Sequence, residues 1–253
     1  THGQTEINVR DMDPRRFGKW ASGDYAIAKS VDEYEQMYQP HLPGEFRDAG
    51  RPTRVTPLYE PLKEAGALYG DTFGWERAKW YAAKDEKENY SFRRNNSFAA
   101  VAKECKVVRE RVGLTDLTSF SKYEVSGTDA QSFLERLCAN RVPTKAGGIV
   151  LSQMLTEKGG IESEATIACL AENHYYLLSA AVAELHDFDW LVQHIQKGEE
   201  VSVTNVTEDF GVLLLTGPLS RDVLSILTET NLSNESGFSW MRAREISVSG
   251  IPV

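Results

Sequence analysis

VLSQMLTEKGGIESEATIACLAENHYYLLSAAVAELHDFDW, residues 150–190, is the stretch that decides the fold. Three apolar-rich runs in it are separated by Glu-Lys-Gly-Gly at 157–160 and by Ala-Glu-Asn-His at 171–174. Gly accepts positive φ angles and Asn tolerates them, so both breaks predict turns between strands. A helical period begins near Ala181. We therefore expect three consecutive strands followed by a helix.

Glu164 is the unusual residue of the middle run, because strands seldom carry a carboxylate at such a position. Alternation along residues 161–170 gives a first face that resembles core, made of Ile161, Ser163, Ala165, Ile167 and Cys169. The second face carries Glu162, Glu164, Thr166 and Ala168. Periodicity alone favours an exposed carboxylate at Glu164. The alternative is that this face lines a cleft, where Glu164 contacts a ring nitrogen or a cation and Thr166 orients the ligand.

A short internal repeat flanks these strands. Residues 123–127 (YEVSG) run into the helix-like DAQSFLERLC, and residues 213–217 (LLLTG) run into PLSRDVLSIL. The glycines lie 90 positions apart, and apolar residues follow both at the same offsets. Each half reads as strand, glycine turn and amphipathic helix. Together with the central strands, the repeat predicts an α+β domain whose mixed sheet carries helices on one side.

The first hundred residues predict mainly short elements. Residues 13–18 read as a turn or helix start, a helix opens near residues 30–34, and residues 40–55 form a connection. Glu76 and Arg77 beside Trp75 are interpreted as a structural ion pair. Ser97 begins a longer helix with one buried face, formed by Phe98, Val101, Cys105, Val108 and Val112.

Composition bounds the function. The 253 residues are 41% hydrophobic and 26% charged, which allows one large domain or two smaller ones. A net charge of −9 argues against a nucleic-acid surface. No apolar run approaches the roughly 18 residues that a membrane span needs, and no signal peptide is evident. The three cysteines are interpreted as buried thiols in a reducing compartment. Both ends read as if the chain were part of a longer polypeptide.

Common catalytic motifs are missing from the sequence. It contains neither GxGxxG nor GxxxxGK[ST]. Its five histidines show no metal-ligand spacing, so no metal site is predicted. No Ser-His-Asp or Cys-His arrangement can be argued.

Five segments of the chain carry a family resemblance: RVTPLYEPLKEAGALYGDTFGWERAKWYA (54–82), GLTDLTSFSKYEVSG (113–127), MLTEKGGIESEATI (154–167), HDFDWL (186–191) and LLLTGPLSRDVL (213–224). Together they resemble the folate-binding fold of the glycine-cleavage aminomethyltransferase, the T-protein. DMDPRRFGKW (11–20) and the junction AGRPTRVTPLY (49–59) narrow the resemblance to the dimethylglycine dehydrogenase and sarcosine dehydrogenase family. In that family a flavin-dependent oxidoreductase domain is fused to the folate-binding domain.

The resemblance implies two domains. Residues 1–55 would be the C-terminal segment of an FAD-dependent oxidoreductase domain with its linker. Residues 56–253 would be an aminomethyltransferase-like folate-binding domain, incomplete at its C-terminal side. The family's FAD fingerprint and its substrate-oxidising residues would precede Thr1, so we expect this piece alone to oxidise nothing.

The resemblance also implies an activity. The full enzyme would oxidise an N-methyl group of dimethylglycine or sarcosine with FAD, and the folate domain would capture the carbon as 5,10-methylenetetrahydrofolate. Electrons would pass to an electron-transfer flavoprotein or to oxygen. The compartment would be the cytoplasm of a bacterium or the mitochondrial matrix of a eukaryote. The alternatives are a non-catalytic folate-binding or structural module and a tetrahydrofolate-dependent aminomethyltransferase or demethylase.

Five residues match the family's folate site. The T-protein's essential aspartate falls on Glu164; dehydrogenase relatives also often carry Glu there, although the extra methylene moves the carboxylate by roughly 1.5 Å. Thr166 matches a folate-contacting position. Phe120, Val150 and Ser179 match positions that line the pterin pocket, with Ser179 standing where the T-protein has Asn. The resemblance thus implies a catalytic role for Glu164 and tetrahydrofolate contacts for the other four.

Overall fold

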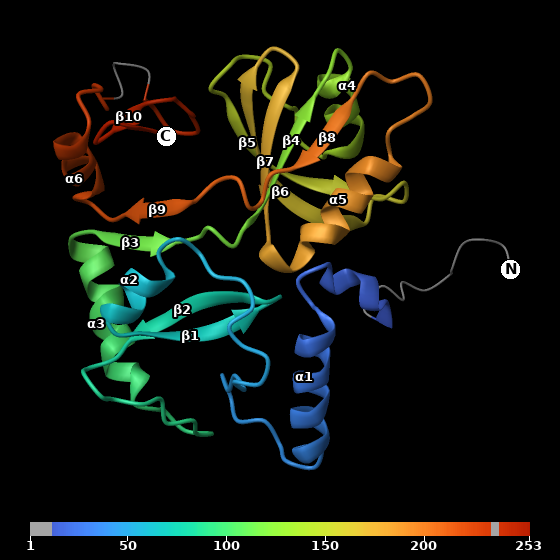
Figure 1. Ribbon diagram of the computed structural model, residues 1–253. Coiled ribbons are helices and arrows are strands. Elements are labelled where there is room, and N and C mark those ends of the chain that lie inside the picture. The colour runs from blue at the N-terminus through green and yellow to red at the C-terminus, as the bar shows by residue number, and fades with distance from the viewer. Residues whose placement is uncertain (1–11, 234–237) are drawn as a thin grey trace, which may run out of the picture. The chain divides into compact units, whose positions relative to one another are not determined.

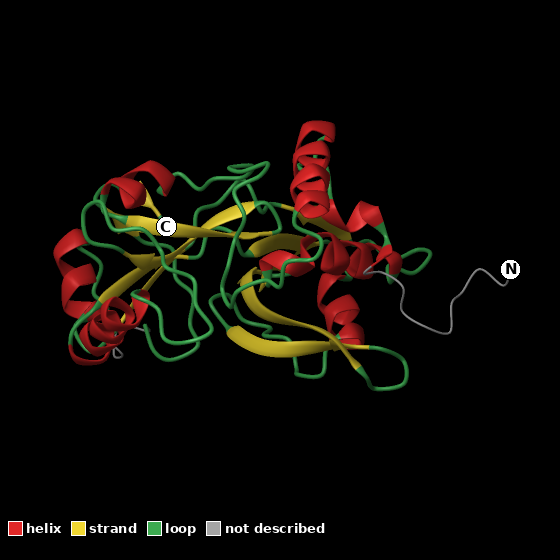
Figure 2. Ribbon diagram, turned by 90° about the horizontal axis from the view of Figure 1, so that it is seen from below, coloured by secondary structure: helices red, strands yellow, loops and turns green. Residues whose placement is uncertain are grey.

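The computed structural model describes residues 12–233 and 238–253, which form two compact units that meet in the sequence between residues 102 and 103 (Figure 1). Each unit contains both helices and strands, which are coloured separately in Figure 2. The predicted α+β class is confirmed. The domain boundary expected at 55–56 lies inside the first unit. The division into residues 1–55 and 56–253 stays a prediction.

The first unit consists of short helices and one hairpin. Its elements are a 3-10 helix (Pro14–Phe17), α1 (Gly23–Glu35), α2 (Tyr59–Glu64), β1 (Ala67–Thr72) and β2 (Trp75–Tyr81). Helix α1 begins earlier than predicted, because the Ser22 side chain accepts a hydrogen bond from the amide of Tyr25 and caps the helix there. Phe73 and Gly74 both have positive φ, which closes β1 and β2 into a tight hairpin.

Glu76 forms a buried ion pair, but with a partner other than the one expected. Arg51 donates from Nε to Oε1 at 2.8 Å and from Nη2 to Oε2 at 2.6 Å. This two-pronged contact raises the pKa of the Arg51 guanidinium above its ordinary value. The expected partner, Arg77, follows Glu76 directly on β2, and neighbouring side chains of a strand point to opposite faces.

The second unit holds most of the regular structure. Its elements are α3 (Ser97–Glu110, which begins in the first unit), β3 (Gly113–Asp116), β4 (Ser121–Ser126), α4 (Ala130–Leu137), β5 (Ile149–Leu155), β6 (Ile161–Ala171), β7 (His174–Ser179), a 3-10 helix (Ala181–Ala183), α5 (Glu184–Gln193), β8 (Ser202–Asn205), β9 (Leu213–Thr216), α6 (Ser220–Leu227), β10 (Ser247–Val248) and β11 (Ile251–Pro252). The three strands and the helix predicted from residues 150–190 are confirmed as β5, β6, β7 and α5.

A five-stranded sheet in the order β5-β6-β7-β4-β8 is the centre of this unit. Every neighbouring pair in it is antiparallel, so the described strands form a purely antiparallel sheet instead of the expected mixed sheet. The reason is local for β5, β6 and β7, since short turns at Gly159 and Asn173 reverse the chain directly. A separate two-stranded antiparallel sheet pairs β3 with β9.

Both α4 and α5 cover the same face of the five-stranded sheet. The core there contains Tyr123, Ile167 and Leu177 from the strands, with Phe133 from α4 and Leu191 from α5. The predicted helices on one side are therefore observed. Ala165, Ile167 and Cys169 lie in this core as alternation predicts, whereas Ile161, at the open end of β6, is 72% exposed.

Two further burial predictions are wrong. None of the residues of α3 is buried, and Phe98 is 50% exposed, because a helical period identifies an apolar stripe without showing what covers it. Cys105 on this helix is exposed as well, while Cys138 and Cys169 are buried as expected.

Candidate functional site

Glu164 lies on the face of the sheet that points away from α4 and α5. It is exposed, and its strand neighbours Ala165 and Ile167 point into the core. On β5 its cross-strand partner is Gln153, whose Nε2 donates to Glu164 Oε2 at 2.9 Å. The carboxylate is therefore oriented by an amide and keeps one oxygen available for a ligand. Gln153 is a supporting residue that the sequence did not indicate.

Thr166 shares this face with Glu164. It is half-buried, and its Cα partners are Leu151 on β5 and Leu178 on β7. Leu178 in turn pairs with Lys122 on β4. Four adjacent strands thus present one row of side chains, Lys122, Leu178, Thr166 and Leu151, next to the Glu164–Gln153 pair. We refer to this row and pair as the Glu164 face.

Val150 and Ser179 lie on the other face of the sheet. Val150 pairs with the core residue Ile167 and packs against the core cluster. Ser179 is buried and follows Leu177 at an interval of two, so it also points to the core side. The structure therefore brings Glu164 and Thr166 together and separates them from Val150 and Ser179.

Phe120 stands just before β4, and Lys122 holds its backbone in place. The Lys122 ammonium donates to the carbonyls of Thr118 at 2.6 Å and of Phe120 at 2.8 Å, and Lys122 is fully buried. Sequence reasoning missed this lysine. Its only signal was a charged residue inside the otherwise regular strand pattern SKYEV.

Glu162 does not belong to the Glu164 face, contrary to simple alternation. Met154 pairs with Ser163 and Leu155 with Ile161, which leaves Glu162 as the extra residue of a β-bulge. A bulge re-aims side chains, and Glu162 reaches His186 of α5 instead. The acidic residues of β6 are thus divided between the two faces.

Tyr176 adds a neutral aromatic side chain to this side of the sheet. It lies two residues before Leu178 on β7 and packs edge-on against Phe210, with ring centroids 6.1 Å apart. Burial, with a contribution from Glu124, raises the pKa of Tyr176 to about 12. The phenol therefore keeps its proton at neutral pH, and Glu164 provides an exposed negative charge on this face.

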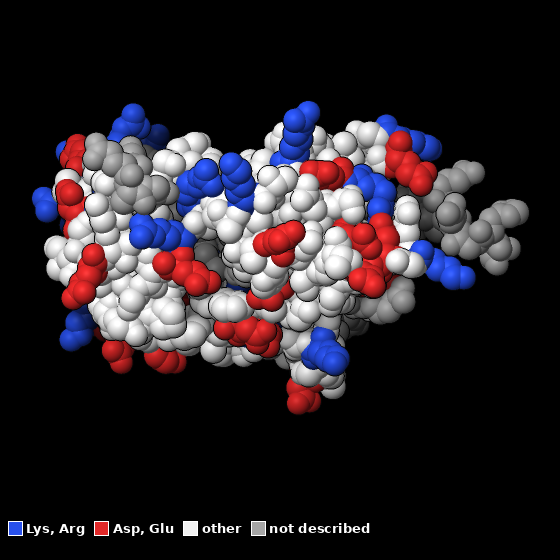
Figure 3. Space-filling view, turned by 90° about the horizontal axis from the view of Figure 1, so that it is seen from above, with Lys and Arg blue, Asp and Glu red and all other residues white. Residues whose placement is uncertain are grey.

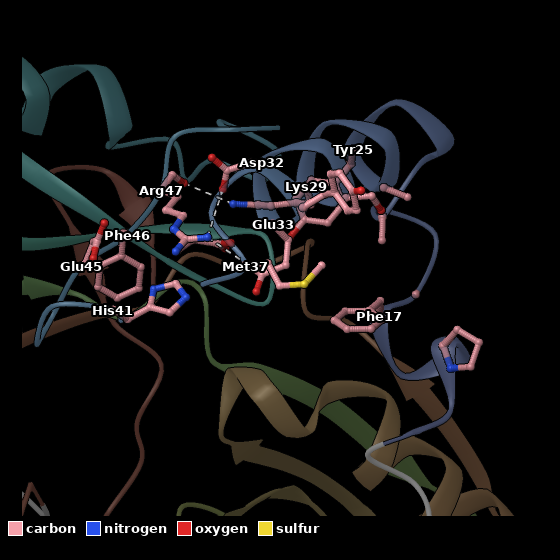
Figure 4. A pocket seen from close by; sticks show the side chains of 17 residues that line it. Phe17, Tyr25, Lys29, Asp32, Glu33, Met37, His41, Glu45, Phe46 and Arg47 are labelled. Atoms are coloured by element: carbon pink, nitrogen blue, oxygen red, sulfur yellow. Dashed lines mark hydrogen bonds and ion pairs between the residues drawn. The ribbon is translucent and has the colours of Figure 1, made fainter. Parts of the chain in front are cut away.

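Two large hollows lie in the first unit. One of about 870 Å³ runs beside α1 and contains Lys29, Asp32, Glu33 and Arg47 (Figure 4). Arg47 Nη1 pairs with Asp32 at 3.7 Å and with Glu33 at 3.1 Å, and Lys29 Nζ donates to the Arg47 carbonyl. Its charged groups thus bind one another, and none of the five predicted site residues lines it. Its size alone carries no functional argument.

Surface charge is mixed on the face shown in Figure 3, where basic side chains alternate with acidic ones. Within the described residues, no group of three or more His, Cys, Asp and Glu could hold a metal ion. His2 lies outside those residues. In the same part of the chain, no helix has both the length and the apolar character required to cross a bilayer.

Comparison with protein families divides the chain in two. The family model of the GCVT N-terminal domain matches residues 58–253. The family model of the FAD dependent oxidoreductase central domain matches residues 2–56. The geometry alone shows an exposed carboxylate on one face of a sheet. The two family matches indicate which classes of reaction to consider for it.

Individual relatives agree with the family matches. The chain is 36% identical over 256 residues to mitochondrial dimethylglycine dehydrogenase of Rattus norvegicus, covering all of this chain and 30% of that protein. It is 29% identical over 255 residues to the mitochondrial pyruvate dehydrogenase phosphatase regulatory subunit of Mus musculus, covering 98% of this chain and 29% of that protein. The chain thus spans about 30% of the length of these relatives.

A solved structure supports the fold. The glycine cleavage system aminomethyltransferase T of Bartonella henselae superposes with a TM-score of 0.57 at 27% identity, over 69% of this chain and 43% of that one. The resemblance inferred from the sequence and the aminomethyltransferase-like fold are both confirmed.

Proposed function

Because the chain belongs to the family of the GCVT N-terminal domain, we propose that it is the folate-binding part of a flavin-dependent dehydrogenase of N-methylated glycines. The observation that carries the proposal is Glu164, an exposed carboxylate oriented by Gln153 beside Thr166. The dimethylglycine dehydrogenase relative suggests the substrate class. Residues 1–55 would then belong to the oxidoreductase half.

The Glu164 face fits a reduced folate. A pterin is flat, with apolar faces and polar edges, and the row offers Leu151 and Leu178 on either side of the Thr166 hydroxyl. Glu164 would hold the nitrogen edge, and Thr166 would fix the orientation. Phe120, Val150 and Ser179 remain proposals, of which Val150 and Ser179 lie on the core side and could act only through the sheet.

When bound, tetrahydrofolate would supply amine nitrogens that accept the one-carbon unit. Glu164 would stabilise the positive charge that develops near it, because a fixed carboxylate that a bound folate covers from bulk water interacts strongly with a cation. Gln153 restricts the carboxylate to one orientation, which lowers the entropic cost of reaching the reactive geometry. This chain's residues thus bind, orient and balance charge.

Other parts of the whole enzyme are proposed on the same family basis. FAD would oxidise the N-methyl amine, and an electron-transfer flavoprotein or oxygen would accept the electrons. Relatives include a mitochondrial protein and a bacterial one, so the mitochondrial matrix and a bacterial cytoplasm are both proposed compartments.

Replacing Glu164 tests the proposal in the full-length protein. We expect Glu164→Gln to leave dye reduction by dimethylglycine within twofold and to lower the yield of 5,10-methylenetetrahydrofolate by about 100-fold, the scale of losing one charge-stabilising group. Glu157→Gln is the matched control, since Glu157 is an exposed carboxylate in the turn before β6. Equal loss of both reactions, or of neither, would contradict the proposal.

A non-catalytic module is the second candidate. The observation that favours it is the similarity to a relative named as a regulatory subunit. Isothermal titration of the full-length protein with tetrahydrofolate separates the candidates in part. Binding that Glu164→Gln weakens supports the folate site, binding without product formation supports a folate-binding module or a different transferase, and no binding leaves a structural module.

A further inference from the structure

Four side chains connect β6 to α5 immediately before Glu164. Glu162 Oε1 lies 2.7 Å from His186 Nε2, and His186 Nδ1 lies 2.8 Å from Asp187 Oδ1. Ser163 Oγ donates to Asp187 Oδ2 at 2.9 Å. We call these four residues the His186 bridge. Its two strand residues directly precede Glu164 in the chain.

Opposite charges on the imidazole and the two carboxylates stabilise the His186 bridge. Both ring nitrogens of His186 face carboxylate oxygens, and an ionised carboxylate can only accept a hydrogen bond. Both contacts therefore form together when the imidazole carries two protons and a positive charge. Asp187 is fully buried, so its carboxylate depends on His186 and Ser163 for partners. It also lies in the first turn of α5, where the helix dipole favours a negative charge.

Helix α5 is a rigid support for this bridge. Leu191 of α5 is fully buried in the core, and the Tyr123 hydroxyl donates to the Glu184 carbonyl at 2.7 Å at the start of the helix. The bulge at Glu162 is what lets β6 reach this helix with two consecutive side chains. Without the bulge, Glu162 would share the Glu164 face and the strand would be tied through Ser163 alone.

We propose that His186 is a positioning residue for the folate reaction, acting through the bridge to fix the height and tilt of Glu164 on its face. This rests on the proposed role of Glu164. A tie at residues 162 and 163 restricts the backbone on the N-terminal side of Glu164, and Gln153 restricts its side chain from β5. A displacement of a reacting group by about 1 Å can reduce the reaction rate by about 100-fold. Hydrogen bonds that hold residues 162 and 163, directly before Glu164, therefore affect the rate.

The test compares three substitutions in the full-length protein. His186→Leu removes the cation and should lower the yield of methylenetetrahydrofolate about tenfold, with dye reduction within twofold. His186→Lys keeps a positive donor between Glu162 and Asp187 and should recover at least half of the yield. His174→Ala is the matched control, because His174 pairs with Glu124 at 3.2 Å on the same sheet, away from residues 162–163. It should change neither reaction.

A pH profile distinguishes positioning from simple packing. The ionisable side chains that contact His186 include Glu162 of β6 and Asp187 of α5. As pH rises, His186 loses its second proton, one contact to a carboxylate is lost, and the folate yield should fall while dye reduction does not. His186→Lys should keep the yield constant to higher pH. Glu162→Gln, whose amide can donate to neutral His186, is a milder variant and should also flatten the profile.

These experiments distinguish failure of the positioning role from failure of the proposed function. If Glu164→Gln lowers the folate yield and His186→Leu does not, the positioning role is wrong and the proposed function stands. If Glu164→Gln has no effect, the proposed function itself fails. Parallel loss of folate yield, dye reduction and thermal stability in both His186→Leu and Glu162→Gln would show a purely structural bridge and overturn the inference.

Discussion

The segments β4–Gly127–α4 and β9–Gly217–α6 have the same local structure and opposite burial. In each, a strand meets a glycine with positive φ, 127° at Gly127 and 113° at Gly217, and a helix of eight residues follows. Phe133, Leu134 and Leu137 of α4 are all buried. At the corresponding offsets α6 carries Val223, Leu224 and Leu227, and no residue of α6 is buried.

The difference comes from the sheet beneath each helix. Helix α4 packs on five antiparallel strands together with α5, whereas α6 follows β9, which among the described residues pairs with β3 alone. Two strands offer too little apolar surface to cover a helix. Ile226 is 82% exposed and its counterpart on α4 is the polar Arg136, so this position faces outward on both helices. Similar sequences therefore produce similar turns and helices, and the neighbouring elements determine how much free energy their apolar side chains contribute.

Truncating one leucine in each helix should give the largest contrast. We expect Leu134→Ala to lower the free energy of unfolding by about 4 kcal/mol and Leu224→Ala by about 1 kcal/mol, because only Leu134 leaves a cavity in a closed core. Urea unfolding followed by circular dichroism measures both. Ile226→Ala is the control and should change stability by less than about 0.5 kcal/mol. Equal losses at Leu134 and Leu224 would show that α6 is covered in solution.

Substituting Gly127 and Gly217 should destabilise the two segments by similar amounts, unlike the leucine substitutions. A Cβ at Gly127 would lie 2.0 Å from the Glu200 carbonyl oxygen, and one at Gly217 would lie 2.5 Å from that of Arg111. Since backbone strain and backbone clashes act irrespective of helix burial, we expect Gly127→Ala and Gly217→Ala each to cost about 2 to 3 kcal/mol.

Gly159→Ala separates strain from clash in that experiment. Gly159 also has positive φ, but a Cβ there would meet nothing within 4 Å. It should cost only about 1 kcal/mol, which is the strain of the left-handed conformation alone. A Gly217 variant no worse than the Gly159 variant would mean that the second turn is more open than the first.

Thiol reactivity compares the buried region around α4 with an exposed helix, without changing the stability of the protein. Cys138 directly follows α4, and burial raises the pKa of its thiol to about 11, so very little thiolate exists at pH 8. Cys105 on α3 is exposed. We expect Cys105 to react with Ellman's reagent at least about 100-fold faster than Cys138, and Cys105→Ser to abolish the fast phase. Since thiolates react, raising the pH should accelerate Cys138 up to about pH 11. Comparable rates at pH 8 would show that the region around α4 opens.

Part of the candidate site could be predicted from the sequence. Period-two alternation placed Glu164 and Thr166 on one face opposite Ala165 and Ile167, because side chains of an extended strand must alternate. Alternation failed at Glu162, where a bulge adds a residue without a sequence signal. Val150 and Ser179 were assigned by resemblance, and the register of β5 and β7 puts both on the core side.

Lys122 and the His186 bridge were not foreseen for a different reason. Their partners are backbone carbonyls or side chains of other elements, such as Thr118 for Lys122 and Glu162 for His186, 24 residues apart in the second case. The His186–Glu162 contact depends on where α5 docks on the sheet, which local spacing does not encode. The Lys122 contacts are local, but they depend on the conformation of the segment before β4, which strand alternation does not describe.

The sequence by itself determined the local conformations. Glycine and asparagine turns, strand alternation and helical periods depend on φ and ψ preferences within a few residues, and they placed β5, β6, β7, α5 and both β–Gly–α segments. Only the tertiary structure decided which apolar stripes are covered and which charges meet. Burial and ion pairing depend on surfaces brought together from distant segments, so α4 is buried, α6 is open, and Glu162 binds His186 while Glu164 faces outward.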